Sequence, residues 1–212
     1  MVKPINSHLN ILHLAQRHDR EEHFKKELEM QGITDYSIHD GIIDRMAVMR
    51  GISNSHKRVV RYAQRQELPN CIIAEDDIEF MGEGAWKYFL SQLEINKDAD
   101  IFLGMIYEGL VDDNNKIVGD PFTFSGLTLY SVNKKFYDKF LEVKEMGHLD
   151  KELGKLADQY VFKVCSPFVA KQIDSFSDNK KKFCEYKQWE KMENGMKRIG
   201  VTVIKSPFQE VH

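Results

Sequence analysis

The sequence of 212 residues predicts an α/β fold with a mostly parallel central sheet flanked by helices. Short apolar segments alternate along the chain with longer segments in which apolar residues recur at helical spacing. One segment, residues 71–74, is apolar at every position, which is typical of a strand that helices cover on both faces. The resulting order of strand, helix and strand favours parallel strands joined by right-handed crossovers.

The composition is that of an ordinary globular protein, with 42% hydrophobic and 30% charged residues. The length suits one sizeable domain, and the net charge of −3 gives no general attraction for nucleic acid. We therefore expect no nucleic-acid partner. The three cysteines, Cys71, Cys165 and Cys184, are odd in number and widely spaced, which favours reduced thiols. No apolar stretch approaches the roughly 20 residues of a membrane span, and the N-terminus lacks a signal-peptide pattern. We expect a cytoplasmic protein.

The beginning of the chain predicts a strand, a helix and a second strand. We expect the first strand at residues 9–14 and a weaker, partly exposed strand at residues 33–39. Between them, Asp19 and Glu22 have the spacing of a capping box, and Gly32 is placed to end the helix.

A second helix is expected at residues 46–66, because Val59, Val60 and Ala63 share one side of it. Ser53 or Ser55 is the expected N-cap of this helix. Pro69 closes the helix and leads the chain into the apolar strand.

The rest of the chain continues the alternation of helices and strands. We expect helices at residues 85–93, 133–143 and 149–156, and strands at 99–107, 123–132 and 160–165. Asn133 is the expected cap of its helix, and Gly126 within a strand predicts close approach of a ligand or of another backbone segment.

The C-terminal part is expected to be less regular. Residues 168–174 should be extended, and residues 174–179 should form a polar loop. We expect residues 1–179 to form the main domain and residues 180–212, where lysine and aromatic residues increase, to be a helical or extended appendage that packs on it.

The apolar strand is followed directly by three acids, Glu75-Asp76-Asp77. Functional groups are commonly presented at the carboxyl ends of such strands. Adjacent carboxylates repel one another unless a cation compensates them, and their hard oxygen atoms suit Mg²⁺ or Mn²⁺ better than Zn²⁺. A divalent cation held there would bind a diphosphate. The alternative is a solvated acidic turn, as is common for runs of charge.

Three short motifs occur in order along the first part of the chain. They are Leu12-His13-Leu14 followed by Arg17 and Arg20, then Gly51-Ile52-Ser53-Asn54-Ser55-His56, and then Cys71 to Phe80. Together they resemble glycosyltransferase family 25, the lipopolysaccharide-biosynthesis type of sugar transferase with a GT-A nucleotide-sugar fold. His13 stands where an asparagine is more usual in the family, and Ile52 replaces a cysteine.

Later segments are also similar to this family, so that the resemblance covers roughly residues 8–178. They are Phe124-Ser125-Gly126 to Tyr130-Ser131, His148-Leu149-Asp150, Ser166-Pro167 to Gln172, and Ser175 to Asp178. The resemblance implies a GT-A-like, Rossmann-related fold and a metal-dependent reaction. The leaving nucleoside diphosphate requires a cation and hydrogen-bond donors fixed in advance.

The resemblance implies roles for the residues of the first and third motifs. Glu75 and Asp77 are the candidate ligands of Mn²⁺ or Mg²⁺, while Asp76 would bind the ribose or structure the turn. Arg17 and Arg20 would bind the base, ribose or phosphates of the donor, or would be solvated surface arginines.

The remaining candidates come from the second motif and from the later segments. Ser55 and His56 would bind a phosphate or line the sugar site, although His56 is also consistent with a structural role. An inverting transfer needs a carboxylate that accepts the proton of the acceptor hydroxyl. Asp150 is the candidate for this catalytic base, with helix capping as its alternative. The lower-ranked candidates Gln172, Asp174 and Ser177 lie where a loop would close over the donor.

The expected function is hexose transfer from a nucleotide sugar, with UDP as the expected nucleotide. The acceptor would be a glycan or a lipid-linked saccharide in the synthesis of surface polysaccharide or lipopolysaccharide. One alternative is a nucleotidyl- or phosphotransferase, although the chain lacks a P-loop motif. Another is a non-catalytic glycan-binding protein on the same fold. The run Lys180-Lys181-Lys182 with Lys187 would allow weak membrane contact, or would be a solvated surface.

Overall fold

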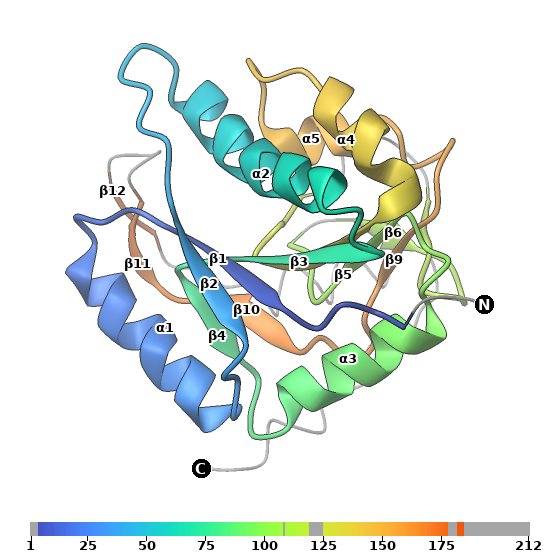
Figure 1. Cartoon of the computed structure of the whole chain (residues 1–212), viewed down its shortest axis with the longest axis horizontal. Coiled ribbons are helices and arrows are strands. Elements are labelled where there is room, and N and C mark those ends of the chain that lie inside the picture. Colours follow the sequence, from blue (N-terminus) through green and yellow to red (C-terminus); the bar gives the residue numbers. More distant parts are fainter. Residues whose placement is uncertain (1–3, 108, 119–124, 178–181, 185–212) are drawn as a thin grey trace.

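A six-stranded sheet forms the centre of the computed structural model, which describes residues 4–107, 109–118, 125–177 and 182–184 (Figure 1). Its strands lie in the order β2-β1-β3-β8-β5-β9. Their bounds are β1 Leu9–His13, β2 Tyr36–Asp40, β3 Asn70–Glu75, β5 Ile101–Leu103, β8 Leu129–Asn133 and β9 Phe162–Val164. Five strands run in one direction, and β8 is antiparallel to both its neighbours, β3 and β5. The mostly parallel α/β sheet predicted from the sequence is confirmed, with one antiparallel strand that was not predicted.

Helices cover both faces of this sheet (Figure 1). They are α1 His18–Met30, α2 Val48–Arg65, α3 Ala85–Ile95, the 3₁₀ turn η1 Lys134–Phe136, α4 Tyr137–Glu142 and α5 Leu149–Gly154. The chain moves outward from β1 to β2 and then returns past β1 to β3. Right-handed crossovers in opposite directions place α1 and α2 on opposite faces of the sheet.

The all-apolar segment predicted as a covered strand lies at the centre of the sheet as part of β3. Ile72, Ile73 and Ala74 have no solvent exposure, and all five residues of the neighbouring β1 are buried. Each fully buried isoleucine of this kind contributes roughly 1.5–3 kcal/mol to stability. The core therefore fixes the carboxyl ends of β1 and β3, where the candidate residues lie.

Three two-stranded sheets surround the central one. Their strands are β4 Ile78–Phe80 with β10 Ala170–Gln172, β6 Leu110–Val111 with β7 Ile117–Val118, and β11 Ser175–Ser177 with β12 Lys182–Cys184. The predicted polar loop at residues 174–179 was wrong for residues 175–177, because their backbone groups pair with β12. Of the lysine run, Lys182 lies in β12. Phe183 and Cys184 complete this strand, and the other residues of the expected appendage lie outside the described residues, so the division into domain and appendage stays a prediction.

The predicted helix starts need two corrections. The Asp19 capping box was wrong: α1 begins at His18, and the Asp19 carboxylate accepts hydrogen bonds from the Arg17 side chain at 2.7 and 2.9 Å. Ser53 and Ser55 are not N-caps, because α2 begins at Val48 and both serines lie inside it. The Ser55 hydroxyl donates to the Gly51 carbonyl one turn earlier, a local bond that serine also makes within helices.

Other local predictions are confirmed. The Asn133 side chain caps η1 by accepting a hydrogen bond from the Lys135 amide at 3.1 Å. Gly126 has a φ of +115°, and a Cβ there would lie 3.0 Å from the Tyr107 ring and 3.1 Å from its amide nitrogen. Gly126 lies before β8 and not within a strand as predicted, but it is the site of close backbone approach that the sequence indicated.

The three cysteines are free thiols and all are buried. Burial raises the pKa of the Cys71 thiol to about 12, so it is protonated and unreactive at neutral pH. Among the described residues, no helix is both long enough and apolar enough to cross a membrane.

Candidate functional site

A cavity of about 320 Å³ lies at the carboxyl ends of β1, β2 and β3. It brings together six of the predicted site residues, Arg20, Ser55, His56, Glu75, Asp76 and Asp77, and two of the lower-ranked candidates, Gln172 and Ser177, but not Asp174. Parallel strands end at the same edge of a sheet, so residues from distant parts of the chain meet there. Two further predicted residues, Arg17 and Asp150, are not among the residues that line the cavity.

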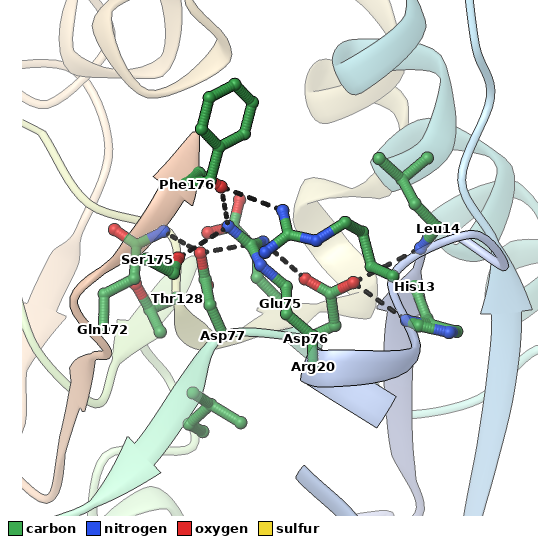
Figure 2. A network of polar contacts seen from close by, with 12 residues as sticks. His13, Leu14, Arg20, Glu75, Asp76, Asp77, Thr128, Gln172, Ser175 and Phe176 are labelled. Atoms are coloured by element: carbon green, nitrogen blue, oxygen red, sulfur yellow. Dashed lines mark hydrogen bonds and ion pairs between the residues drawn. The ribbon is translucent and has the colours of Figure 1, made fainter. Parts of the chain in front are cut away.

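Asp76 is the most completely bonded member of the acidic triplet. Its carboxylate accepts hydrogen bonds from His13 Nδ1 at 2.9 Å, the Leu14 amide at 3.3 Å and Arg20 Nη1 at 2.7 Å (Figure 2). Burial opposes ionisation of Asp76, but the bond from His13 and the charge of Arg20 outweigh it and lower the pKa. Asp76 is thus a fixed anion that joins the turn after β3 to β1 and α1.

Asp77 has a different environment. Its Oδ2 lies 3.0 Å from Arg20 Nη1 and accepts a hydrogen bond from Gln172 Nε2 (Figure 2). Its buried Oδ1 has no hydrogen-bond partner. Burial, followed by the charge of Glu75, raises the pKa of Asp77 to about 7 although Arg20 opposes this. Asp77 therefore holds its negative charge weakly and has an oxygen atom available for a further partner.

Arg20 and Arg17 connect the triplet to β11. Arg20 bridges Asp76 and Asp77, and its Nη2 donates to Ser175 Oγ at 3.0 Å and to the Phe176 carbonyl at 3.3 Å (Figure 2). Arg17 Nη1 donates to the same carbonyl at 2.9 Å. Arg17 thus supports the site from outside the cavity lining by holding β11 in place.

Glu75 is the least constrained acid of the triplet. Its side chain is 29% exposed and lies 3.5 Å from His56 Nε2. His56 is buried, and its Nδ1 lies 2.7 Å from the Tyr130 hydroxyl. The Ser55 hydroxyl accepts a hydrogen bond from the Ile42 amide at 2.8 Å and so fixes the loop at Ile42, which also lines the cavity.

Buried polar atoms without a partner concentrate at this cavity. Among the described residues, four buried side-chain atoms lack a hydrogen bond, and three belong to residues lining the cavity. These three are His13 Nε2, which lies 3.8 Å from the Glu21 carboxylate, Arg20 Nε and Asp77 Oδ1. An unpaired buried polar atom costs roughly 1–3 kcal/mol and requires an explanation. A polar ligand, an ion or bound water would provide it.

The residues present fit a divalent cation that is shared with a ligand. No group of three or more His, Cys, Asp or Glu side chains in the described part of the chain is arranged to hold a metal ion. Glu75 and Asp77 nevertheless offer two carboxylates, one with the unpartnered Oδ1. Mg²⁺ is usually bound by one or two carboxylates together with substrate phosphates, so two protein ligands suffice for such a site.

Asp150, the predicted catalytic base, lies at the start of α5. Its carboxylate accepts hydrogen bonds from the Gly126 amide at 3.2 Å and from its neighbour Lys151 at 2.8 Å. Gly126 lies beside Tyr107, and the Tyr107 hydroxyl donates a hydrogen bond to Gln172. Gln172 in turn donates a hydrogen bond to Asp77. Asp150 is thus linked to Asp77 through intervening residues, and its catalytic role stays a prediction.

Sequence reasoning missed the apolar wall of the cavity. This wall is apolar and consists of Leu14, Ile42, Ile43, Val48 and Ile52. The segment of this wall from Ile42 to Val48 was expected to be only a turn and the start of a helix. The signal was the pair Ile42-Ile43 directly after Asp40-Gly41, where a turn would normally be polar. His13 was noted only as a departure from a motif, yet it holds Asp76.

Comparison with known proteins gives information on the fold alone. No protein-family model and no curated protein matches this sequence. Among solved structures, the chain is similar to the crystal structure of A197 from STIV, with a TM-score of 0.52 and 11% sequence identity. The match covers 78% of this chain and 84% of the other. It supports an α/β, Rossmann-like arrangement. The GT-A assignment and the resemblance to glycosyltransferase family 25 stay predictions.

Proposed function

We propose that this protein is a glycosyltransferase that moves a sugar from a nucleotide-sugar donor to a saccharide acceptor. The observation that carries the proposal is the cluster of three buried polar atoms without a hydrogen bond at the cavity, next to adjacent carboxylates. Sites at the carboxyl ends of parallel strands commonly bind nucleotides. A diphosphate with its cation would satisfy both the donors and the acceptor of this cluster.

The donor diphosphate would lie against the acidic triplet and Arg20. Asp77 and Glu75 would hold Mg²⁺ or Mn²⁺, and Arg20 would donate to a phosphate oxygen from its free Nε. When bound, such a cation neutralises the charge that develops on the leaving diphosphate. Arg20 would add to this stabilisation, and Asp76 would keep the guanidinium in place through the 2.7 Å contact.

The apolar wall would bind the base of the nucleotide. Leu14, Ile42 and Ile52 offer an apolar surface for a planar ring in the same cavity as the charged triplet. A cavity that offers both apolar and charged groups matches a ligand with a flat base at one end and phosphates at the other. UDP stays our candidate nucleotide, as expected from the sequence.

In the transfer itself, the acceptor hydroxyl oxygen forms a bond to the anomeric carbon. The bond between this carbon and the diphosphate oxygen breaks, and the electron pair leaves with the nucleoside diphosphate. A carboxylate takes the hydroxyl proton. Asp150 is our candidate for this base.

The proposal is tested by calorimetric titration of nucleotide sugars in the presence of Mn²⁺, followed by analysis of the released product. We expect binding of at least one nucleotide sugar and release of a nucleoside diphosphate. Asp77→Asn should weaken binding at least tenfold. The matched control Asp98→Asn, at an exposed carboxylate away from the cavity, should bind like the wild type.

Two variants test the assigned roles. Asp150→Asn should keep donor binding but lose transfer, whereas Glu75→Gln removes a proposed cation ligand and should weaken donor binding. Release of pyrophosphate would instead indicate a nucleotidyltransferase. Absence of binding to every nucleotide sugar, with and without Mn²⁺, would contradict the proposal.

A further inference from the structure

The connection between β2 and α2 exposes more large apolar side chains than any other short segment described here. In residues 42–48, Met46 is 92% exposed and Ile43 is 60% exposed, and Ile42 and Val48 are also exposed. Figure 1 shows this connection projecting away from the body of the protein at the start of α2. Apolar side chains gathered at a projecting tip indicate a contact surface, whereas single exposed ones need no explanation.

The helix that follows the tip is strongly basic on its outer side. Arg58, Arg61 and Arg65 are exposed and share one face at spacings of three and seven residues. Residues 41–65 contain six basic residues and one acid, a net charge of +5, whereas the whole chain carries −3.

Little of this positive charge is neutralised by the protein. The acid of the segment, Asp44, pairs with Arg50 at 2.5 Å. The basic residue Lys57 is buried and pairs with Glu145 at 3.2 Å. In the part of the chain that the structure describes, Arg61 and Arg65 form no ion pair. The outer face of α2 is therefore complementary to an anionic surface.

We propose that residues 42–48 and the outer face of α2, together the docking edge, bind the surface of an anionic lipid bilayer. Ile43 and Met46 insert among the headgroups, and the arginines contact lipid phosphates. Each basic side chain near such a surface contributes about 1 kcal/mol, and apolar insertion adds to this.

A bilayer fits the docking edge better than a nucleic acid does. Nucleic acid would use the arginines through its phosphates but would leave Ile43 and Met46 without an apolar partner. A bilayer uses both features because anionic headgroups lie directly above an apolar layer.

The position of the docking edge has a consequence for the cavity. Ile42, Ile43 and Val48 belong both to the exposed tip and to the cavity lining. Membrane binding would thus hold the cavity close to the lipid surface. If the proposed sugar transfer is correct, this arrangement favours a lipid-linked acceptor, but the docking itself does not depend on that function.

Cosedimentation with vesicles tests the docking edge without any enzymatic assay. We expect the wild-type chain to bind phosphatidylcholine vesicles that contain roughly one third phosphatidylglycerol, and not vesicles of phosphatidylcholine alone. The double variant Arg61→Gln/Arg65→Gln should bind about 30-fold more weakly. The double variant Ile43→Ser/Met46→Ser should lose about tenfold or more.

Matched controls lie on α3, which covers the other face of the sheet. Lys87→Gln and Ile95→Ser remove an exposed lysine and an exposed isoleucine there, and should leave vesicle binding unchanged. All the substituted side chains are exposed, so circular dichroism and the melting temperature should also stay unchanged.

Three results would overturn the proposal. The first is equal binding to neutral and anionic vesicles, or to neither. The second is an equal loss of binding in the α3 controls. The third is binding of a short duplex DNA that depends on Arg61 and Arg65, with vesicle binding indifferent to Ile43 and Met46, which would identify a nucleic-acid surface instead.

Discussion

Asp76 and Asp77 are adjacent in sequence, yet their surroundings shift their pKa values in opposite directions. Both are buried, which opposes ionisation. For Asp76, the hydrogen bond from His13 and the charge of Arg20 outweigh burial and lower the pKa. For Asp77, burial and the neighbouring Glu75 raise the pKa to about 7. Asp76 therefore remains an anion, whereas ionised Asp77 would be stabilised by a further positively charged partner.

This difference predicts how Asp77→Asn changes stability with pH when divalent cations are removed. Because the pKa of Asp77 is raised from 3.8 to about 7, the folded protein binds more protons than the unfolded chain between these values. Stability therefore falls as the pH rises through this window. Asparagine does not ionise, so Asp77→Asn should be more stable than the wild type at pH 8 by up to roughly 4 kcal/mol. The difference in the free energy of unfolding should be smaller at pH 5.

Urea unfolding at both pH values in a chelating buffer measures this effect. Asp98→Asn is the control, since the Asp98 side chain is exposed and folding does not bury its charge. An equal effect of Asp77→Asn at pH 5 and pH 8 would show that ionisation of Asp77 does not oppose folding.

Single residues of the site could be predicted from the sequence only where a local pattern marked them. The triplet stood out because three acids follow an all-apolar strand. The partners of Asp76 could not be derived in this way, because His13 and Arg20 lie 63 and 56 residues away in the chain. Which of several polar residues meet at a sheet edge depends on strand order, and residue type alone does not specify it.

At the scale of elements, Gly126 packs the segment before β8 against the Tyr107 segment. Its φ of +115° is strained for any other residue, and an added Cβ would meet backbone as well as the Tyr107 ring. Gly32 offers a comparison, because it also has a positive φ of +64° but open space around its Cβ position.

We therefore expect Gly126→Ala to destabilise the protein more than Gly32→Ala. Alanine in the left-handed region costs about 1–2 kcal/mol, which is the whole effect expected at Gly32. Gly126→Ala adds the collision with Tyr107 and should cost about 1–3 kcal/mol more. Urea denaturation of the two variants measures the difference, and equal losses would mean that the Tyr107 segment moves aside without cost.

The errors in the predicted elements have identifiable physical causes. The start of α2 was placed too late because Ser53 and Ser55 are typical N-cap residues, but here they lie within the helix and Ser55 bonds to Gly51. β11 was assigned to a loop because its serines and aspartate-rich flanks favour turns. Pairing with β12 and the contacts of Phe176 with two arginines give its backbone an extended form.

At the scale of the whole molecule, the sequence predicted the class of fold but not its full topology. Periodicity and the alternation of strands and helices indicate a parallel sheet. They do not indicate that β8 enters the sheet between β3 and β5 in the opposite direction. The strand is equally apolar in either direction, so its orientation is decided by the connections around it.

The same whole-molecule view predicts how ligands should change thermal stability. If the cation is shared between Asp77, Glu75 and a diphosphate, Mn²⁺ alone and UDP alone should each stabilise the fold little. Together, at about 100 times the dissociation constant, they should add about 2.7 kcal/mol, which raises the melting temperature of a chain of this size by roughly 5–10 °C.

This joint effect separates a shared cation site from two independent sites, because independent ligands would add their separate shifts. Asp77→Asn should remove the joint effect while leaving any stabilisation by UDP alone, since the apolar wall of Leu14, Ile42 and Ile52 is unchanged. A thermal melt of wild type and variant, with each ligand alone and with both, provides the measurement. Additive shifts in the wild type, or a joint shift that survives in Asp77→Asn, would place the cation away from the triplet. The three unpartnered polar atoms at the cavity would then need a different ligand.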